Sequence, residues 1–175
     1  MPQSFKTQAT IFFRLSFCLL FTFFLLTAYT QTPAKNKQQQ KAEQALLKYL
    51  HKLCTDFTKN EMPIELGTIT KPFRIEQESL VLVRRFETDS AVLFQKYIMP
   101  VSEITDVFFD YYIGFEGTSY QSVSTAIAKG NEQQYNKSNS LLLLHVAPVG
   151  DIEEGYTIQT KLLSLVKALQ EAYKK

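Results

Sequence analysis

Cysteine and histidine are scarce in this chain of 175 residues, which contains two of each. Cys18 lies in an N-terminal apolar segment, so Cys54 is the one cysteine of the remainder and an internal disulfide there is excluded. Two histidines and one cysteine supply too few ligands for a structural zinc site. A glycine-rich phosphate loop is also missing. The sequence therefore predicts no catalytic residue, no cofactor and no metal.

The chain also lacks a large excess of acidic or of basic residues. The full chain has 19 basic and 17 acidic residues. Lys6 and Arg14 belong to the N-terminal segment, and without these two the basic residues also number 17. A nucleic-acid-binding protein needs a basic face. The even balance therefore argues against nucleic acid as a partner.

The first 30 residues have the pattern of a secretory signal. Lys6 and Arg14 are their only charges, and the run from Leu15 to Ala28 is rich in Leu and Phe. A charged start followed by such an apolar stretch is typical of a removable signal peptide. We expect residues 1–30 to be cleaved and the mature protein to be exported, either periplasmic or secreted.

The alternative is that the segment is retained as a membrane anchor. The protein would then contact the membrane only through this segment. A spanning helix needs roughly 17–25 apolar residues, and the run from Leu15 to Ala28 has about 14. The length therefore favours cleavage.

After the signal, residues 31–41 read as a polar tether and residues 42–175 as a single α+β domain. Apolar residues that recur every three or four positions predict a helix of about 20 residues from Ala42. The same periodicity from Ile158 to Tyr173 predicts a C-terminal helix.

Between the helices the pattern predicts six or seven antiparallel strands. Their centre is the stretch from Ser79 to Glu116, where apolar runs that begin at Leu80, Ala91 and Val107 are separated by turn-like residues. Both faces of the first run are apolar, so this sheet needs cover on two sides. The remaining predicted strands are Ile64–Lys71, Phe73–Glu76, Ser122–Ala128 and, after a polar loop at residues 129–140, Leu141–Val146.

The run from Val107 to Glu116 is predicted to be one strand with two different faces. Alternation places Val107, Phe109, Tyr111, Ile113 and Phe115 on a continuous core face. The opposite face holds Phe108, Asp110, Tyr112 and Glu116. This second face is either half covered by a helix or exposed as a contact surface, and Phe108 and Tyr112 are the candidate contact residues.

Three features together resemble the pleckstrin-homology-like superfold: the run of strands, the segment Tyr97–Val107 and the apolar pattern of Leu162–Leu169. In that superfold a bent antiparallel sheet or partial barrel is capped by a C-terminal helix. The resemblance covers roughly Ile64 to Tyr173. The chain is also similar to small exported bacterial proteins that place an extra helix before such strands. A lipocalin-like or other small barrel, or a plain helix-covered sheet, has the same periodicity.

The resemblance implies binding of peptides or phosphoinositides. Head-group binding in the superfold uses basic residues clustered at one open end of the barrel. Arg84 and Arg85 are consecutive, so their side chains point to opposite faces of a strand. A shared fold does not supply a function by itself.

Two functional hypotheses follow. The favoured one is an exported, non-catalytic binding module for a protein, a peptide or an apolar small molecule. The alternative is an enzyme with a site of scattered residues around His145 or His51. Cys54 follows His51 by three positions on the predicted helix, so their side chains could be neighbours. Asp106 and Asp110 share a strand face but lie about 13 Å apart, too far for a typical carboxylate pair.

Overall fold

The structure is a computed structural model that describes residues 36–56, 66–132 and 134–174. Residues from Lys37 onward form one unit. Its described elements, in chain order, are α2 (Lys37–Asp56), β1 (Thr68–Glu76), β2 (Ser79–Thr88), β3 (Ala91–Pro100), the 3-10 turn η2 (Val101–Glu103), β4 (Ile104–Phe109), β5 (Tyr112–Gly117), β6 (Val123–Lys129), β7 (Asn136–Leu141), β8 (Leu143–Pro148) and α3 (Ile152–Tyr173). The predicted α+β class is confirmed, and the described residues have one helix before the strands and one after them.

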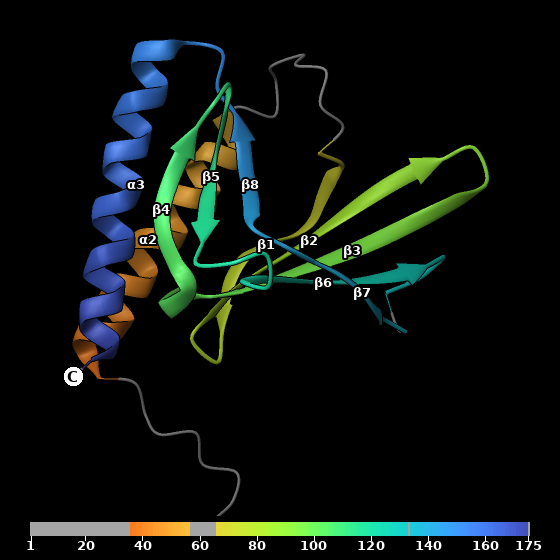
Figure 1. The fold of residues 1–175 in the computed structure, drawn as a ribbon, viewed down its shortest axis with the longest axis horizontal. Helices are drawn as coiled ribbons and strands as arrows, with labels where there is room; N and C mark the ends of the chain where they lie inside the picture. The colour runs from red at the N-terminus through yellow and green to blue at the C-terminus, as the bar shows by residue number, and fades with distance from the viewer. Residues whose placement is uncertain (1–35, 57–65, 133, 175) are drawn as a thin grey trace, which may run out of the picture. The chain divides into compact units, whose positions relative to one another are not determined.

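The eight described strands form two antiparallel sheets (Figure 1). Sheet A has the order β1-β2-β3-β6-β7, and sheet B has the order β4-β5-β8. The chain leaves sheet A after β3 to build the β4–β5 hairpin of sheet B, returns for β6 and β7, and ends with β8 in sheet B. Sheet B is therefore assembled from two separate parts of the sequence.

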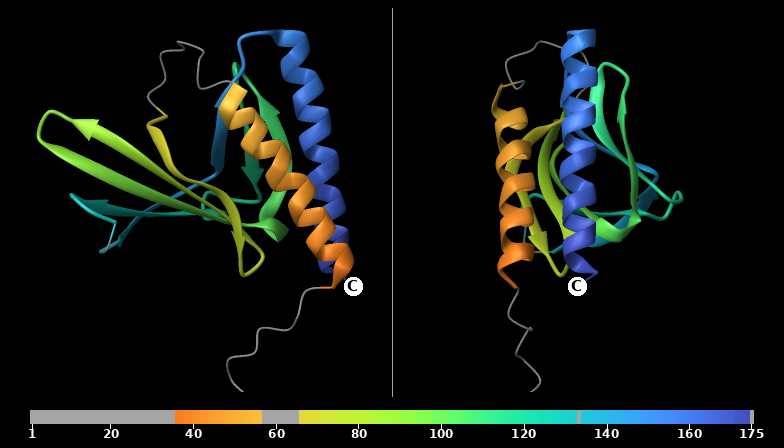
Figure 2. Two further views of the ribbon diagram at one scale, coloured as in Figure 1. Left: turned by 180° about the vertical axis from the view of Figure 1, so that it is seen from behind. Right: turned by 90° about the vertical axis from the view of Figure 1, so that its left-hand side faces the viewer.

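Both described helices pack on one face of sheet B (Figure 2). Their buried side chains join those of the two sheets in one apolar core. Core members without exposed surface include Leu46 and Leu50 of α2, Leu162 and Leu169 of α3, and Val107, Ile113 and Phe115 of sheet B. The predicted core positions of these three sheet residues are confirmed, and so is the burial of β2 on both faces from Leu80 to Val83.

Helix α3 also protects the outer edge of sheet B. Gln159 donates from Nε2 to Val107 O at 2.6 Å. Gln170, roughly three helical turns further on, donates from Nε2 to Val101 O at 2.9 Å and Ile104 O at 2.8 Å. Because β4 is an edge strand, carbonyls along this side would otherwise be free to pair with another chain. The two glutamines fix α3 along that edge.

Helix α2 begins at Lys37, earlier than the expected start at Ala42. The sequence pattern assigns residues 37–41 to the tether because they are polar, yet Lys and Gln are good helix formers. The early turns are also held by α3, since Tyr173 donates from Oη to Glu43 Oε1 at 2.7 Å. Burial and this buried carboxylate raise the pKa of Tyr173.

Strand β1 continues across Pro72, where the pattern predicts two short strands. Proline has no N–H for a ladder, so it is tolerated at sheet edges and bulges. β1 is an edge strand, and its register against β2 shifts between Ile69 and Lys71 and again between Lys71 and Arg74. The irregular edge position therefore explains why one strand can contain this proline.

The stretch from Val107 to Glu116 forms two strands, so its prediction as one strand is wrong. β4 ends at Phe109, and β5 begins at Tyr112 after a turn at Asp110 and Tyr111. Tyr111 has a φ of 55°, a backbone conformation that bulky residues rarely adopt. Apolar periodicity does not reveal such a turn. Tyr111, predicted to lie on the core face, is exposed.

Strand β7 (Asn136–Leu141) lies, apart from Leu141, in the predicted polar loop. β7 is the other edge of sheet A and pairs only with β6, so backbone hydrogen bonds can hold it without an apolar side. At Leu142 the chain crosses to sheet B, and Leu142 O accepts a hydrogen bond from Gly117 N at 2.9 Å. The predicted strand Leu141–Val146 is therefore divided between β7 and β8.

The predicted signal peptide, residues 1–30, lies outside the described residues, as does the tether up to residue 35. In the part of the chain that the structure describes, no helix has the length and apolar character needed to cross a membrane.

Candidate functional site

The face of sheet B away from the helices carries three packed rings. The strand register places Phe108 opposite Gly114, and Gly114 opposite His145. Gly114 leaves room for the Phe108 ring, since a Cβ at that position would lie 2.4 Å from two ring atoms. The His145 ring meets Phe108 at a centroid distance of 5.2 Å and an angle of 81°, and Tyr112 at 5.8 Å and 83°. We call Phe108, Tyr112 and His145 the aromatic cluster.

The structure thus brings the two candidate contact residues together with the histidine of the enzymatic hypothesis. The helices cover the opposite face of sheet B, so helical cover does not account for these aromatics. Tyr112 is 5% exposed, whereas Phe108 and His145 are half-buried. Edge-to-face ring pairs contribute about 0.5–1.5 kcal/mol each beyond burial. Phe108 and His145 are the cluster members that a partner can reach, and the contact role expected for Phe108 and Tyr112 stays a prediction.

A buried arginine from sheet A holds the strand that carries His145. Arg84 of β2 is 3% exposed. Its Nη1 donates to Leu66 O at 2.8 Å, and its Nη2 donates to His145 O at 3.1 Å and Val146 O at 2.9 Å. The pairing of β5 with β8 shifts register here and leaves Val146 without an opposite residue. Arg84 therefore satisfies backbone carbonyls at an irregular point of β8.

Carbonyl oxygens alone offset the charge of Arg84 within the described residues. No Asp or Glu of these ranges forms an ion pair with it. Burial lowers the pKa of Arg84, yet an arginine side chain remains protonated in proteins. Arg85 points the other way and pairs with Glu87 at the surface. The predicted opposite directions of Arg84 and Arg85 are confirmed.

His145 is electrostatically tuned by its surroundings. Burial lowers its pKa from the ordinary value of 6.5, and the positive charge of Arg84 lowers it further, while Asp110 acts in the opposite direction. The ring is therefore mainly neutral at pH 7. A neutral imidazole packed between two aromatic rings fits an apolar contact better than a charged one.

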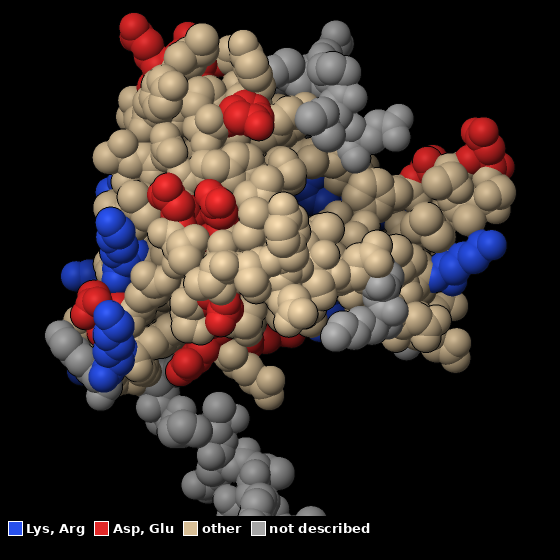
Figure 3. Space-filling view, viewed as in Figure 1, with Lys and Arg blue, Asp and Glu red and all other residues tan. Residues whose placement is uncertain are grey.

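Negative charge surrounds the aromatic cluster. Asp106 lies opposite Glu116 across β4 and β5, and Asp110 lies in the turn between these strands. β4, β5 and β8 contain no Lys or Arg. In Figure 3 acidic side chains lie over β4 and β5, whereas basic ones gather over the C-terminal half of α3. The outer face of sheet B thus combines an apolar centre with charges of one sign.

The second histidine lies elsewhere. His51 Nε2 is 2.6 Å from Phe73 O, and Cys54 Sγ is 3.9 Å from Val146 O. Burial raises the pKa of Cys54 to about 11. In the described structure His51 and Cys54 hydrogen-bond to these separate carbonyls and not to each other. The thiol therefore lacks the activated state that a nucleophile needs.

The acidic residues do not converge on one point either. Asp106 Oδ1 accepts a hydrogen bond from Val107 N at 2.8 Å, and Asp110 belongs to the turn and not to the same strand. Among the residues that the structure describes, no group of three His, Cys, Asp or Glu is placed to hold a metal ion.

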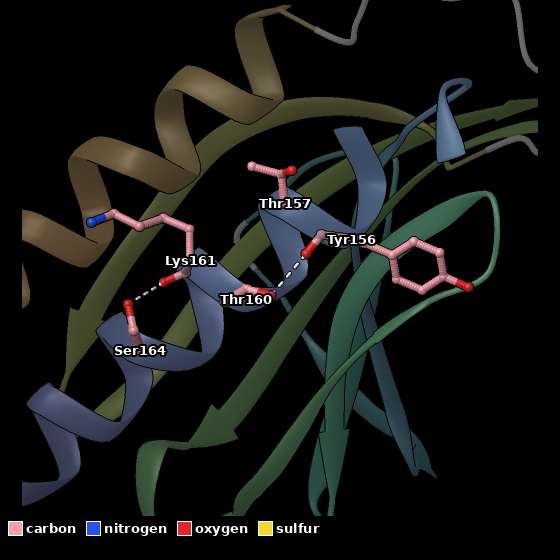
Figure 4. Close-up of a pocket in the computed structure, with 5 residues that line it drawn as sticks. All are labelled: Tyr156, Thr157, Thr160, Lys161 and Ser164. Carbon is pink, nitrogen blue, oxygen red and sulfur yellow. Dashed lines mark hydrogen bonds between the residues drawn. The ribbon is translucent and has the colours of Figure 1, made fainter. Parts of the chain in front are cut away.

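A hollow on the solvent side of α3 is lined by Tyr156, Thr157, Thr160, Lys161 and Ser164 (Figure 4). Its hydroxyls bond to the helix backbone: Thr160 Oγ1 donates to Tyr156 O at 3.0 Å, and Ser164 Oγ donates to Lys161 O at 2.8 Å. Lys161 extends toward α2, whereas Tyr156 points to the side of the β4–β5 hairpin. This hollow lacks the convergent polar groups of a ligand site.

Comparison of the chain with models of protein families, with curated proteins and with solved structures finds no match. No relative supplies a function for the aromatic cluster, so its role has to follow from its own geometry and chemistry.

Removal of Arg84 should destabilise the fold. Arg84→Ala leaves buried carbonyls on Leu66, His145 and Val146 without their donor. We expect the free energy of unfolding to fall by about 3 kcal/mol in urea titrations. Arg85→Ala is the matched control, because a surface ion pair contributes at most about 1 kcal/mol. Equal losses in the two variants would contradict the role given to Arg84.

His145 should make stability depend on pH. Its pKa is lower in the folded than in the unfolded chain, so below about pH 6.5 the unfolded state binds more protons. The contribution of His145 to the free energy of unfolding is therefore complete above that pH and is lost on acidification. We expect the thermal midpoint to fall from pH 7.5 to pH 5.5, and to fall less in His145→Gln. A flat profile in wild type, or an equal fall in His145→Gln, would refute this.

Proposed function

We propose that this protein is an exported, non-catalytic binding module that holds a polypeptide partner against the outer face of sheet B. The observation that carries the proposal is the combination on this face of a half-buried Phe108 with the carboxylates of Asp106 and Glu116, while the two described helices pack on the opposite face. Aromatic side chains dominate the energy of protein interfaces, and polar residues form their rims.

A polypeptide fits this face better than a small apolar molecule. A small ligand is usually enclosed in a cavity that covers most of its surface. Two hollows on the described surface, one on α3 and one around Gln170, contain no residue of the aromatic cluster. An open face with the half-buried rings of Phe108 and His145 beside the carboxylates of Asp106 and Glu116 is instead suited to a flat contact.

Export is proposed on the pattern of residues 1–30, with a charged start and an apolar run. A kinship with the pleckstrin-homology-like superfold is likewise a proposal. Two antiparallel sheets with a helix at the C-terminal end support it, whereas the order β1-β2-β3-β6-β7 is more complex than a run of neighbouring strands. Phosphoinositide binding gains no support, because the strands around the aromatic cluster lack basic residues.

The enzymatic alternative is tested most directly at Cys54. With a pKa of about 11, its thiolate fraction at pH 8 is roughly a hundredfold below that of an unperturbed cysteine. We expect iodoacetamide to label Cys54 at least tenfold more slowly in the folded protein than in urea, as followed by peptide mass spectrometry. Equal rates would contradict the burial of the thiol, and faster labelling in the folded protein would show an activated thiol and revive the hypothesis of a site around His51.

The binding proposal is tested with tagged full-length protein in the native host. We expect wild type to be recovered from an exported fraction with a mass lacking about 30 N-terminal residues, together with a partner. Phe108→Ser should reduce the bound partner at least fivefold. Glu116→Lys should do so too, without altering the rings. Tyr120→Ser is the control, because Tyr120 is exposed and outside sheet B.

The outcomes separate the two parts of the proposal. Full-length mass in the membrane pellet would mean that the segment is a retained anchor. Equal partner recovery from Phe108→Ser, Glu116→Lys and Tyr120→Ser, each with a wild-type circular dichroism spectrum, would remove the outer face of sheet B as the contact surface.

A further inference from the structure

Three of the large exposed apolar side chains belong to the β4–β5 turn and the start of α3, two segments that contact each other. Tyr111 is 59% exposed, Ile152 55% and Tyr156 59%; Tyr120, at 76%, lies elsewhere in the chain. We call Tyr111, Ile152 and Tyr156 the end patch. It shares no residue with the aromatic cluster and is independent of the function proposed for that cluster.

Contacts between the two elements hold the end patch together. The turn is tied to the segment before α3, since Val149 N donates to Tyr111 O at 2.9 Å. On the helix side, the Tyr156 ring packs edge to face on Phe109 of β4 at 5.5 Å and 79°. Figure 4 shows Tyr156 on the side of the hairpin. The end patch therefore packs on β4 through Tyr156, while its side chains remain exposed to solvent.

A tyrosine at position 111 is unfavourable for the stability of the fold. Its φ of 55° is a region where glycine is at ease and a tyrosine is strained by about 1 kcal/mol or more. The side chain gains little burial in return, because more than half of its surface is exposed. An exposed aromatic held in an unfavourable backbone conformation is better explained by a contact with another molecule.

The charges around the end patch identify the partner. Asp110 precedes Tyr111, and Asp151, Glu153 and Glu154 surround Ile152. Acidic groups at a helix start have a structural use, and Asp151 Oδ1 indeed accepts from Glu154 N at 2.7 Å. Capping a helix does not, however, explain why basic residues are missing nearby. No Lys or Arg occurs in residues 97–128 or 138–160. The next cation along α3, Lys161, extends toward α2 and away from the hairpin side on which Tyr156 lies, so the charged residues next to the end patch in the sequence, which we call its rim, are acidic.

We propose that the end patch binds a lysine- or arginine-rich polypeptide segment of another protein through apolar side chains of that segment. The apolar side chains would cover Tyr111, Ile152 and Tyr156, and the cations would pair with the carboxylates of the rim. An anionic membrane surface carries the same sign as the rim and is repelled by it. The apolar part supplies affinity, and the charges supply orientation and salt dependence.

The test uses a designed amphipathic peptide of leucine and lysine as the probe, with the same peptide carrying glutamate for lysine as its control. Binding to the purified full protein is followed by fluorescence anisotropy at low and at 0.5 M salt. We expect the lysine peptide alone to bind, and salt to weaken its binding at least fivefold. Tyr156→Ser should weaken it at least fivefold. Tyr120→Ser, which removes an exposed tyrosine outside the patch, should change it less than twofold.

Tyr111→Gly gives a second and sharper variant, because it relieves the strained backbone. We expect its thermal midpoint to equal or exceed that of wild type while peptide binding weakens at least threefold. A merely structural tyrosine would not combine retained stability with lost binding.

Three results would overturn the proposal. The first is that Tyr156→Ser and Tyr111→Gly leave binding of the lysine peptide unchanged. The second is that the glutamate peptide binds equally well. The third is that a second copy of the protein occupies the patch, seen as self-association that Tyr156→Ser abolishes. Phe108→Ser should leave peptide binding unchanged, so failure here is distinguishable from failure of the surface on sheet B.

Discussion

The contact between Arg84 and the backbone of β8 is the constraint on which sheet B most depends. A charged side chain almost fully removed from water is destabilising unless its donors are satisfied. Arg84 meets this demand with carbonyls of three residues, two of them at the bulge of β8. Because the guanidinium comes from β2, it joins sheet A to the strand that carries His145. The contact fixes the backbone at His145, and the charge of Arg84 adds to burial, the main cause, in lowering the pKa of His145.

Sequence reasoning succeeds where apolar residues repeat with the period of a strand or a helix. β2, β3 and α3 have such patterns, and the structure confirms these elements, although β3 is half-buried over most of its length. It fails at places governed by the backbone. β7 is an edge strand held by hydrogen bonds to β6, so its residues carry no apolar alternation. The turn at Tyr111 depends on a positive φ, which no count of apolar residues predicts.

In the candidate site, too, some features follow from the apolar pattern and others depend on the backbone and the topology. Phe108 and Tyr112 are found on one face although the strand predicted to hold both is a hairpin. Phe108 pairs with Gly114, and alternation along β5 returns Tyr112 to the same face. His145 joins them from a strand far along the chain, and Arg84 approaches from another sheet. Pairings between distant strands are set by topology, so neither contact could be read from spacing.

Net charge also conceals how the charges are placed. The equal numbers of acids and bases outside the first 30 residues suggest a neutral surface, but the described part of the chain separates the signs. Exposed lysines of α2 recur at Lys37, Lys41, Lys48 and Lys52, a spacing that puts them on one side of the helix opposite its buried residues.

Sheet B, on the far side of the helices, has only acidic charges. A molecule of this kind exerts little net attraction at long range but a strong orienting field close by. A cationic partner is turned toward sheet B and the start of α3, and away from the helices. The two proposed contact surfaces lie on that acidic side, so the same field would guide a partner to either one before short-range contacts with Phe108 or Tyr156 decide where it stays.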